Sequence, residues 1–157
     1  MSMAGNVRNY LDRTGLHYSV DRHQHTSTSM RTAEAAHVSG RQIAKGVLLK
    51  DTSGYLLAVV PATHQVWIGQ LHDRLGRELD TAPETDLADV FSDCEVGAVP
   101  ALGPAYDLDT VVDQSLRGQP DIYFEGGDHE ELVHLAGEDF EELMEDAKFI
   151  NCSMRIG

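Results

Sequence analysis

The sequence has 157 residues, of which 41% are hydrophobic and 24% are charged, as is usual for a globular protein that can bury a core. No run of about 18 apolar residues occurs, no secretory signal is recognisable at the start, and two cysteines make no disulfide framework. We therefore expect one domain over residues 1–157, no membrane span, and a location in the reducing cytoplasm.

The formal net charge of −14 is unevenly distributed along the chain. Residues 1–50 carry seven Arg or Lys against three acidic residues, whereas residues 51–157 carry five against 23. The overall acidity argues at first against a polyanionic partner. The asymmetry is compatible with a basic face around Arg22, Arg31 and Arg41 that meets an anion, or with an acidic face that only aids solubility.

The first 40 residues predict a helix, a strand and a second helix. Apolar residues recur at helical spacing from Val7 to Leu11, and Gly15 is a suitable stop for that helix. Residues 17–23 (HYSVDRH) alternate like a short strand. Residues 26–40 begin with several N-cap candidates, continue with helix-forming residues and end at a glycine.

The next segment predicts a hairpin and two helices. Two strand-like runs, 43–51 (IAKGVLLKD) and 54–62 (GYLLAVVPA), flank a turn-prone stretch, as in a β-hairpin. Residues 68–79 carry apolar side chains at spacings of three and four, which indicates an amphipathic helix. A capping box that begins at Thr81 predicts another short helix.

The rest of the chain predicts a turn-rich loop over 95–106 and then short strands with a last helix around Phe140. The expected strands are 108–113, 121–125, 131–136 and 148–152. Because strands gather in the middle and late parts with helices between them, we predict an α+β fold. Its central sheet is expected to be mixed, mostly antiparallel and barrel-like, with helices around it.

Lys45 is one of three lysines in the chain and lies in an apolar strand. On a strand it shares one face with Val47 and Leu49, while Gly46 leaves the backbone open to close approach by a ligand. Lys50, at the strand end, reaches solvent easily. Two interpretations of Lys45 stay open: a lysine whose stem covers apolar surface while its ammonium reaches water, or a functional amine held in a pocket.

Two further segments are candidates for a site. In residues 97–103 (GAVPALG), glycines around a proline predict a fixed irregular loop whose N–H groups can line a small pocket, although an ordinary connector fits equally well. Asp113 ends a β-branched run, and GGDH at residues 126–129 follows a later strand. An aspartate at a strand end is usually a turn former or a cap.

The histidines and cysteines give little support to metal or nucleophilic chemistry. In HEELVH, His129 and His134 are five residues apart, so one helix face cannot present both to zinc. His23 and His25 share a strand face, but no third ligand is suggested nearby, and no metal site is expected. Cys94 follows an acidic run that raises a thiol pKa, so we expect a packed residue.

Taken in order, several segments resemble the YbaK/ProX family of aminoacyl-tRNA editing domains, which are also found inserted in bacterial prolyl-tRNA synthetases. The resemblance covers nearly the whole chain, and its strength comes from the order of the segments rather than from any one of them. The segments that carry it are TAEAA, AKGVLLK, VVPA, DCEVGAVPALG, TVVD and GGDH.

This resemblance implies the YbaK-type editing fold and the activity of a free-standing, trans-editing aminoacyl-tRNA deacylase without a cofactor. The reaction would hydrolyse the ester between a small mischarged amino acid, of the Ala, Cys or Ser class, and the 3′ end of a tRNA. An aminoacyl-tRNA synthetase is a candidate partner, and both a monomer and a homodimer are compatible with the sequence.

The resemblance also assigns site residues. The functional lysine of the family falls on Lys45, and Asp113 and His129 are second candidates, as an orienting group and as a pocket wall or proton carrier. The expected substrate-binding residues are Gly97, Ala98, Val99, Pro100, Ala101, Gly103 and Gly127. Relatives commonly carry a proline where this chain has Ala101, so we expect a changed pocket size or a weaker activity.

Two other functions stay open from the sequence. One is a non-catalytic domain of the same fold that binds a ligand or a partner and regulates it. The other is a metal hydrolase that uses His23, His25 or His129.

Overall fold

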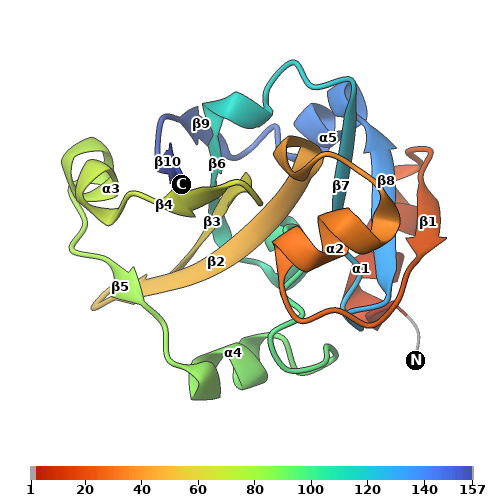
Figure 1. The fold of residues 1–157 in the computed structure, drawn as a ribbon. Helices are drawn as coiled ribbons and strands as arrows, with labels where there is room; N and C mark the ends of the chain where they lie inside the picture. The colour runs from red at the N-terminus through yellow and green to blue at the C-terminus, as the bar shows by residue number, and fades with distance from the viewer. Residues whose placement is uncertain (1–2, 157) are drawn as a thin grey trace.

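Strands β2 (Ile43–Asp51) and β3 (Gly54–Pro61) form an antiparallel hairpin at the centre of the molecule, as the sequence predicts (Figure 1). The computed structural model describes residues 3–156. In the turn, Asp51 Oδ1 accepts the N–H groups of Ser53 at 2.9 Å and Gly54 at 3.1 Å. Gly54 has a φ of 136°, a conformation that a residue with a Cβ rarely adopts.

The hairpin belongs to a sheet with the strand order β1-β8-β7-β2-β3-β6-β9, and β5 pairs with β2 beside this path. Most pairs are antiparallel, but β2/β7, β3/β6 and β6/β9 are parallel. This confirms the mixed, mostly antiparallel α+β fold, although the described strands leave two sheet edges and do not close into a barrel. The other strands are β1 (Ser19–Arg22), β5 (Asp80–Thr81), β6 (Asp109–Asp113), β7 (Asp121–Glu125), β8 (Glu131–Ala136) and β9 (Lys148–Ile150).

Helices surround the sheet, with α2 in front of it and α4 below it in the view of Figure 1. Each of the helices predicted from apolar spacing or capping signals is present. No helix within residues 3–156 has the length and apolar character needed to span a membrane. The helices are α1 (Gly5–Thr14), α2 (Ser29–Ala36), α3 (Ile68–Leu75), α4 (Glu84–Val90) and α5 (Gly137–Leu143), with 3₁₀ turns η1 (Gly40–Gln42), η2 (Gly103–Tyr106) and η3 (Gln114–Leu116).

The two faces of the central hairpin bury different side chains. One face, with Leu48 and Leu57, packs with α1 and α5 in the larger apolar core. The other face, with Leu49 and Val60, packs with α3 in a smaller core. Strand alternation therefore directs the apolar residues of β2 into two cores, and Lys45 lies on the same face as Leu49.

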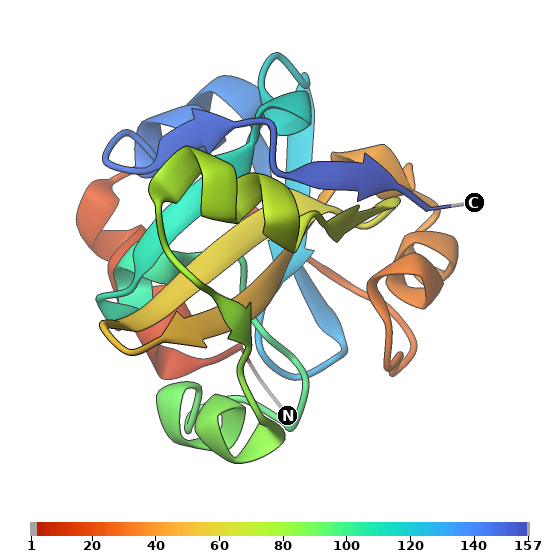
Figure 2. The ribbon, with the colours of Figure 1, turned by 90° about the vertical axis from the view of Figure 1, so that its left-hand side faces the viewer.

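The sequence did not predict a ribbon of two short strands, β4 (His64–Val66) and β10 (Ser153–Arg155), which pair antiparallel (Figure 2). Each has only three residues, too few to show a clear alternation. The helix expected over residues 68–79 ends at Leu75 because Gly76 adopts a left-handed φ of 64°.

The Asp51–Arg77 pair ties the hairpin to the end of α3, with Arg77 Nε 2.8 Å from Asp51 Oδ2. The hydrogen bond from Arg77 lowers the pKa of Asp51 from 3.8 to about 2. A carboxylate with a depressed pKa stabilises the fold above its unfolded value and loses this contribution as the pH falls through its folded value. Asp51→Asn should therefore lower Tm at pH 7, and the difference from the wild type should shrink between pH 4 and pH 2.

Thermal unfolding followed by circular dichroism over this pH range measures the effect. Asp73→Asn removes the same charge from an exposed position of α3 and is the control. An equal loss in both variants at pH 7 would show that the ion pair does not stabilise the turn.

Candidate active site

The sheet opens beside Lys45, because two neighbouring strands pair with different parts of β2 on the same side. Strand β7 pairs only with Ile43 and Ala44, and β5 pairs only with Leu49 and Lys50. Among residues 3–156, no strand pairs with 45–48 on this side of β2. The gap leaves backbone and side chains of β2 available to line a cavity.

A cavity of about 160 Å³ occupies this gap. Its walls come from the start of α2, from β2, from the loop before η2 and from the β7–β8 connection. The lining residues are Ser27, Thr28, Ser29, Thr32, Ile43, Ala44, Lys45, Gly46, Gly97, Val99, Glu125, His129 and Leu132. Four of the residues expected from the sequence are thus brought together: Lys45, Gly97, Val99 and His129.

Lys45 is half-buried, and its Nζ makes no hydrogen bond or ion pair within the described residues 3–156. Burial lowers the pKa of its ammonium group below 10.5, because removing the charge from water costs free energy that no counter-ion here offsets. Lys50 contrasts with it: its Nζ lies 2.6 Å from Asp86 Oδ2, and that hydrogen bond raises its pKa. An anionic or strongly polar ligand would therefore stabilise the charged form of Lys45.

Gly46 determines where the loop before η2 can lie. A Cβ at this position would lie 3.1 Å from Val99 Cγ1, 3.2 Å from Leu57 Cδ1 and 3.3 Å from the carbonyl oxygen of Pro100. The loop thus packs directly on the backbone of β2, next to Lys45. The absence of a side chain at Gly46 is what permits this approach.

His129 is fixed by its backbone and by its ring. It is 8% exposed and adopts a left-handed φ of 61°. Its Nε2 lies 2.8 Å from the carbonyl oxygen of Val96, which can only accept, so Nε2 carries a proton. In the neutral ring Nδ1 is then unprotonated, and it lies 3.9 Å from Glu125 Oε1.

The sequence interpretation missed Glu125, which ends β7 and lines the cavity. Its Oε2 accepts the N–H groups of Gly127, Asp128 and His129 at 2.8, 3.2 and 3.1 Å, so one carboxylate oxygen fixes the whole turn that carries His129. Burial raises the pKa of Glu125, and the backbone hydrogen bonds only partly oppose this. Its position directly before the GGDH segment was the available signal.

The start of α2 supplies the hydroxyl-rich wall of the cavity. Thr28 is the N-cap, and its side chain accepts the N–H of Arg31 at 3.1 Å. The hydroxyl of Thr32 donates to the carbonyl oxygen of Thr28 at 3.0 Å. The sequence predicted these caps but not their place in the site, because the packing of α2 across β2 is a long-range contact.

Asp113 is not among the residues that line the cavity. It is 3% exposed, and its carboxylate accepts the N–H of Cys152 at 2.9 Å, the N–H of Ser115 at 3.1 Å and the hydroxyl of Ser115. Burial raises the pKa of Asp113, but these hydrogen bonds outweigh it and hold the pKa below the ordinary value. Asp113 caps η3 and ties β6 to the segment before β10.

The remaining substrate-loop residues support the cavity wall from behind rather than line it. Ala98, Pro100 and Ala101 are buried, and Ala101 is fully enclosed in the larger core. Gly103 starts η2, and Gly127 packs against Ala4 and Cys94. The departure at Ala101 therefore acts on the cavity only through the packing of the loop.

The other chemical candidates are engaged in local contacts. His23 Nδ1 lies 2.6 Å from the carbonyl oxygen of Gln24, and His25 Nε2 lies 3.3 Å from Glu95. Residues 3–156 contain no group of three or more side chains arranged to hold a metal ion. Burial raises the pKa of the Cys94 thiol to about 12, so this residue is no ready nucleophile.

A larger hollow of about 680 Å³ lies elsewhere, between α1, α3, β6 and the segment that follows α5. It contains none of the residues expected in the site. Its lining includes five carboxylates, from Asp107, Asp109, Glu142, Glu145 and Asp146. This concentration of negative charge is unfavourable for a polyanion, so the smaller cavity is the better candidate site.

Comparison with known proteins is consistent with this assignment. A family model described as an aminoacyl-tRNA editing domain matches residues 23–143. No curated protein matches the sequence significantly. Among solved structures, a candidate trans-editing enzyme for prolyl-tRNA synthetase superposes with a TM-score of 0.81 at 22% identity, covering 99% of this chain and 100% of the other.

Two further solved structures share the fold. The hypothetical protein APE2540 has a TM-score of 0.83 at 22% identity, with 95% of this chain and 99% of the other covered. A candidate signal transduction protein from Marinobacter aquaeolei VT8 has a TM-score of 0.78 at 22% identity, but only 31% of that longer chain is covered, against 98% of this one. At such identities these likenesses establish the fold alone.

Gly46→Ala tests how tightly the loop is held against β2. The added Cβ must displace Val99 or the Pro100 backbone, so overpacking should lower the free energy of unfolding by about 1–3 kcal/mol. Amide NMR shifts should change along 97–103. Gly5→Ala, at a helical position with nothing within 4 Å of the added Cβ, is the control and should be neutral or stabilising. Unchanged loop shifts in Gly46→Ala would contradict the packing described here.

Proposed function

Because the chain belongs to the aminoacyl-tRNA editing domain family and is an aminoacyl-tRNA deacylase, we propose that it hydrolyses the ester of a small mischarged amino acid in the cavity at Lys45. The substrate class proposed is Ala, Cys or Ser on the 3′ end of a tRNA. The observation that carries the proposal is the half-buried Lys45 ammonium, which has no partner within residues 3–156 and faces a cavity of about 160 Å³.

Lys45 supplies a positive charge at the point where the substrate carries negative charge. The phosphate of the terminal nucleotide is one such group, and the oxyanion that develops at the ester carbonyl is another. The start of α2 adds the positive end of a helix dipole to the same cavity. Ligand binding would also offset the desolvation cost of the ammonium, which raises the Lys45 pKa towards its ordinary value.

Hydrolysis of an aminoacyl ester needs positioning more than a covalent nucleophile, because the ester is already activated. The N–H groups of Gly97 and Val99 form no backbone hydrogen bond outside regular elements within the described residues, and both residues line the cavity. In the proposed mechanism they hold the ester, and a water attacks the carbonyl carbon with help from the neighbouring ribose hydroxyl. The bond to the ribose oxygen then breaks and releases the amino acid.

His129 and Glu125 complete the proposed site. The hydrogen bond to Val96 directs the proton to Nε2, so Nδ1 of the neutral ring can accept a proton or orient a water. Glu125 fixes the turn that carries His129. We propose His129 as a wall of the pocket and a proton carrier, and Asp113 as a positioning residue that acts from outside the cavity.

The size of the cavity supports a small amino acid. Cavities for drug-sized ligands measure about 300–1,000 Å³, and this one is about 160 Å³ with apolar walls from Ile43, Val99 and Leu132. Such a volume suits an aminoacyl group while the nucleotide lies outside. A hydrophobic pocket that must favour a larger amino acid over a smaller one gains only about 1–3 kcal/mol of binding free energy per methylene. A small pocket that must exclude a larger amino acid can do so by steric clash.

The proposal extends to the organisation of the protein. We propose that residues 1–157 act as one free-standing domain in the cytoplasm, in trans on tRNA that a synthetase has mischarged. A contact with a synthetase would compensate for the weak attraction between an acidic protein and RNA.

A panel of mischarged tRNAs tests the function. Lys45→Ala should lower the deacylation rate by roughly 100-fold or more, the usual effect of removing one preorganised electrostatic contact. Lys50→Ala is the matched control, because it removes a lysine from the same strand whose ammonium already pairs with Asp86. The rate is read from the loss of labelled aminoacyl-tRNA with and without protein.

The folded state of Lys45→Ala is checked by its Tm, which should not fall, because the variant removes a desolvated charge. Absence of turnover on tRNAs that carry Ala, Ser and Cys would overturn the proposed substrate class. Equal rates for Lys45→Ala and the wild type would overturn the role of Lys45.

The pH profile provides a second test of Lys45. Because burial lowers its pKa, the ammonium loses its proton at a lower pH than an ordinary lysine. If the charged form is required, kcat/KM should decline on the alkaline side once spontaneous hydrolysis is subtracted. Lys45→Arg, which stays protonated, should be less active but should lack this decline. A decline of the same form in Lys45→Arg would assign it to another group.

A further inference from the structure

Six stretches of eleven or more residues contain none of the 26 acidic residues of the chain: 1–11, 22–33, 35–50, 52–72, 96–106 and 147–157. Three of them, 35–50, 52–72 and 147–157, contain η1, β2 up to Lys50, β3, β4, β9 and β10. Their arrangement in space decides whether they form one surface.

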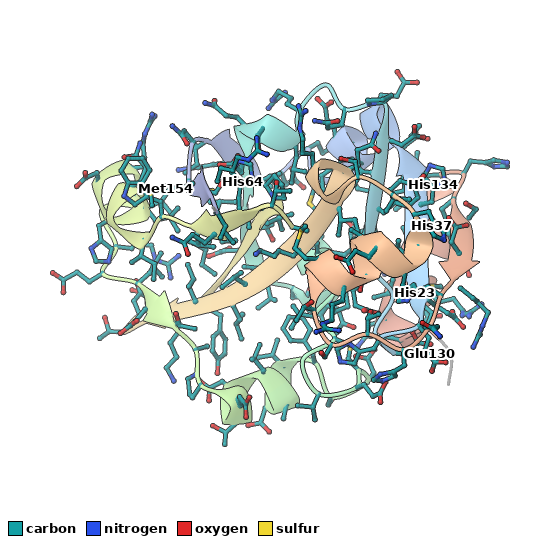
Figure 3. The ribbon with its side chains drawn as sticks, viewed as in Figure 1. His23, His37, His64, Glu130, His134 and Met154 are labelled. Atoms are coloured by element: carbon teal, nitrogen blue, oxygen red, sulfur yellow. The ribbon has the colours of Figure 1, made fainter. Side chains whose placement is uncertain are left out.

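The three segments meet beside the cavity. Ala62 N donates to the carbonyl oxygen of Ile43 at 2.8 Å, and Ile156 N donates to that of Thr63 at 2.9 Å. Arg155 of β10 is opposite His64 of β4 in the ribbon. In Figure 2 the end of β10 and helix α2 both extend towards the right, the side that faces the viewer in Figure 1, and Figure 3 shows His64 and Met154 near the ribbon of β4 and β10.

The surface formed by these three segments carries positive charges without an ion-pair partner. Arg41 and Arg155 are exposed, and neither forms an ion pair within residues 3–156. Some basic side chains elsewhere are paired, such as Arg22 with Glu131 at 2.8 Å and Arg117 with Glu141 at 3.6 Å. Arg22, which the sequence suggested for a basic face, is thus neutralised locally.

His64 reports the electrostatic environment of the surface. Burial lowers the pKa of its imidazole, and the charges of Arg155, Lys45 and Arg41 lower it further, opposed by Asp113. The carboxylate of Asp113 is itself engaged by hydrogen bonds from Ser115 and Cys152. Arg41, Arg155 and Lys45 therefore lie close enough to one another to lower the pKa of the same imidazole.

We propose that Arg41 and Arg155 bind backbone phosphates of the RNA strand that leads to the aminoacylated 3′ end, outside the cavity. The inference rests on the proposed function, since it assumes that the substrate of the Lys45 cavity is attached to RNA. The two side chains act as point contacts to phosphate, so they add affinity without reading sequence. Arg155 comes from the otherwise acidic end of the chain, and only the fold brings it to this surface.

RNA fits this surface better than a protein partner does. Arginines without an ion-pair partner match a phosphate backbone, whereas the carboxylates exposed elsewhere repel it. In and beside the ribbon, the exposed apolar side chains are Trp67, Met154 and Ile156, at 41%, 41% and 53%. An exposed indole offers a stacking surface to unpaired bases.

Binding of an uncharged acceptor-stem minihelix, followed by fluorescence anisotropy over a salt series, tests the inference without hydrolysis. The double variant Arg41→Ala/Arg155→Ala should raise Kd by roughly tenfold and lower the slope of log K against log salt by about 1.4, for two lost phosphate contacts on a single strand. Arg8→Ala/Arg13→Ala removes the same charge from α1, on the other face of the sheet, and should change neither value by as much.

Hydrolysis distinguishes this inference from the proposed function. With an aminoacylated CCA trinucleotide, the double variant should keep the wild-type rate, and with an aminoacylated minihelix its KM should rise while kcat stays unchanged. Equal minihelix binding by the two double variants would overturn the inference and leave the surface to a protein partner. Failure of the wild type on both substrates, with RNA binding still dependent on Arg41 and Arg155, would overturn the proposed function alone.

Discussion

The ammonium group of Lys45 lies half-buried on an otherwise apolar strand face, without a counter-ion among the described residues. Desolvation makes this unfavourable for the free protein, and the surrounding structure is arranged around the charge rather than to neutralise it. The parallel pairing of β7 with β2 ends after Ala44, the loop before η2 packs on Gly46, and the turn after Glu125 directs His129 to the same gap. A negatively charged or strongly polar ligand would complement this charge, as is typical of a binding site and not of a packing defect.

Much of the fold follows from local sequence. The hairpin could be predicted from the sequence because two long apolar strands flank a turn in which Asp51 accepts backbone N–H groups, and both features are local. The ribbon of β4 and β10 could not be predicted from the sequence, because a strand of three residues shows no clear alternation and the two strands are far apart in the chain. The cavity was predicted only in part. Lys45, the 97–103 loop and His129 were expected from the order of the segments. Glu125 and the hydroxyl groups of α2 were not, because their place in the cavity depends on long-range contacts.

The distribution of charge in space differs from its distribution along the chain. The sequence suggested a basic first third, yet Arg22 is paired with Glu131, and Arg155 from the acidic end joins Arg41 near the cavity. The five carboxylates of the larger hollow lie at a different place, on α5, on the segment after it and around the start of β6. Because repulsion from one region and attraction to another both orient an approaching polyanion, the strong net negative charge is compatible with an RNA substrate that approaches from one side.

Asp113 is connected to the ribbon of β4 and β10 by two successive hydrogen bonds. Its carboxylate accepts the N–H of Cys152, and the carbonyl oxygen of Cys152 in turn accepts the N–H of Trp67 at 2.8 Å. These two bonds connect the end of β6 to the junctions before β10 and after β4, so they set the position of the ribbon that carries His64 and Arg155. The predicted role of Asp113 as an orienting residue stays a proposal, in which Asp113 acts through the backbone of the ribbon rather than through contact with the substrate. Under these proposals Asp113 acts on RNA binding and on fold stability together, whereas Lys45 acts on the reaction and, in the free protein, opposes stability.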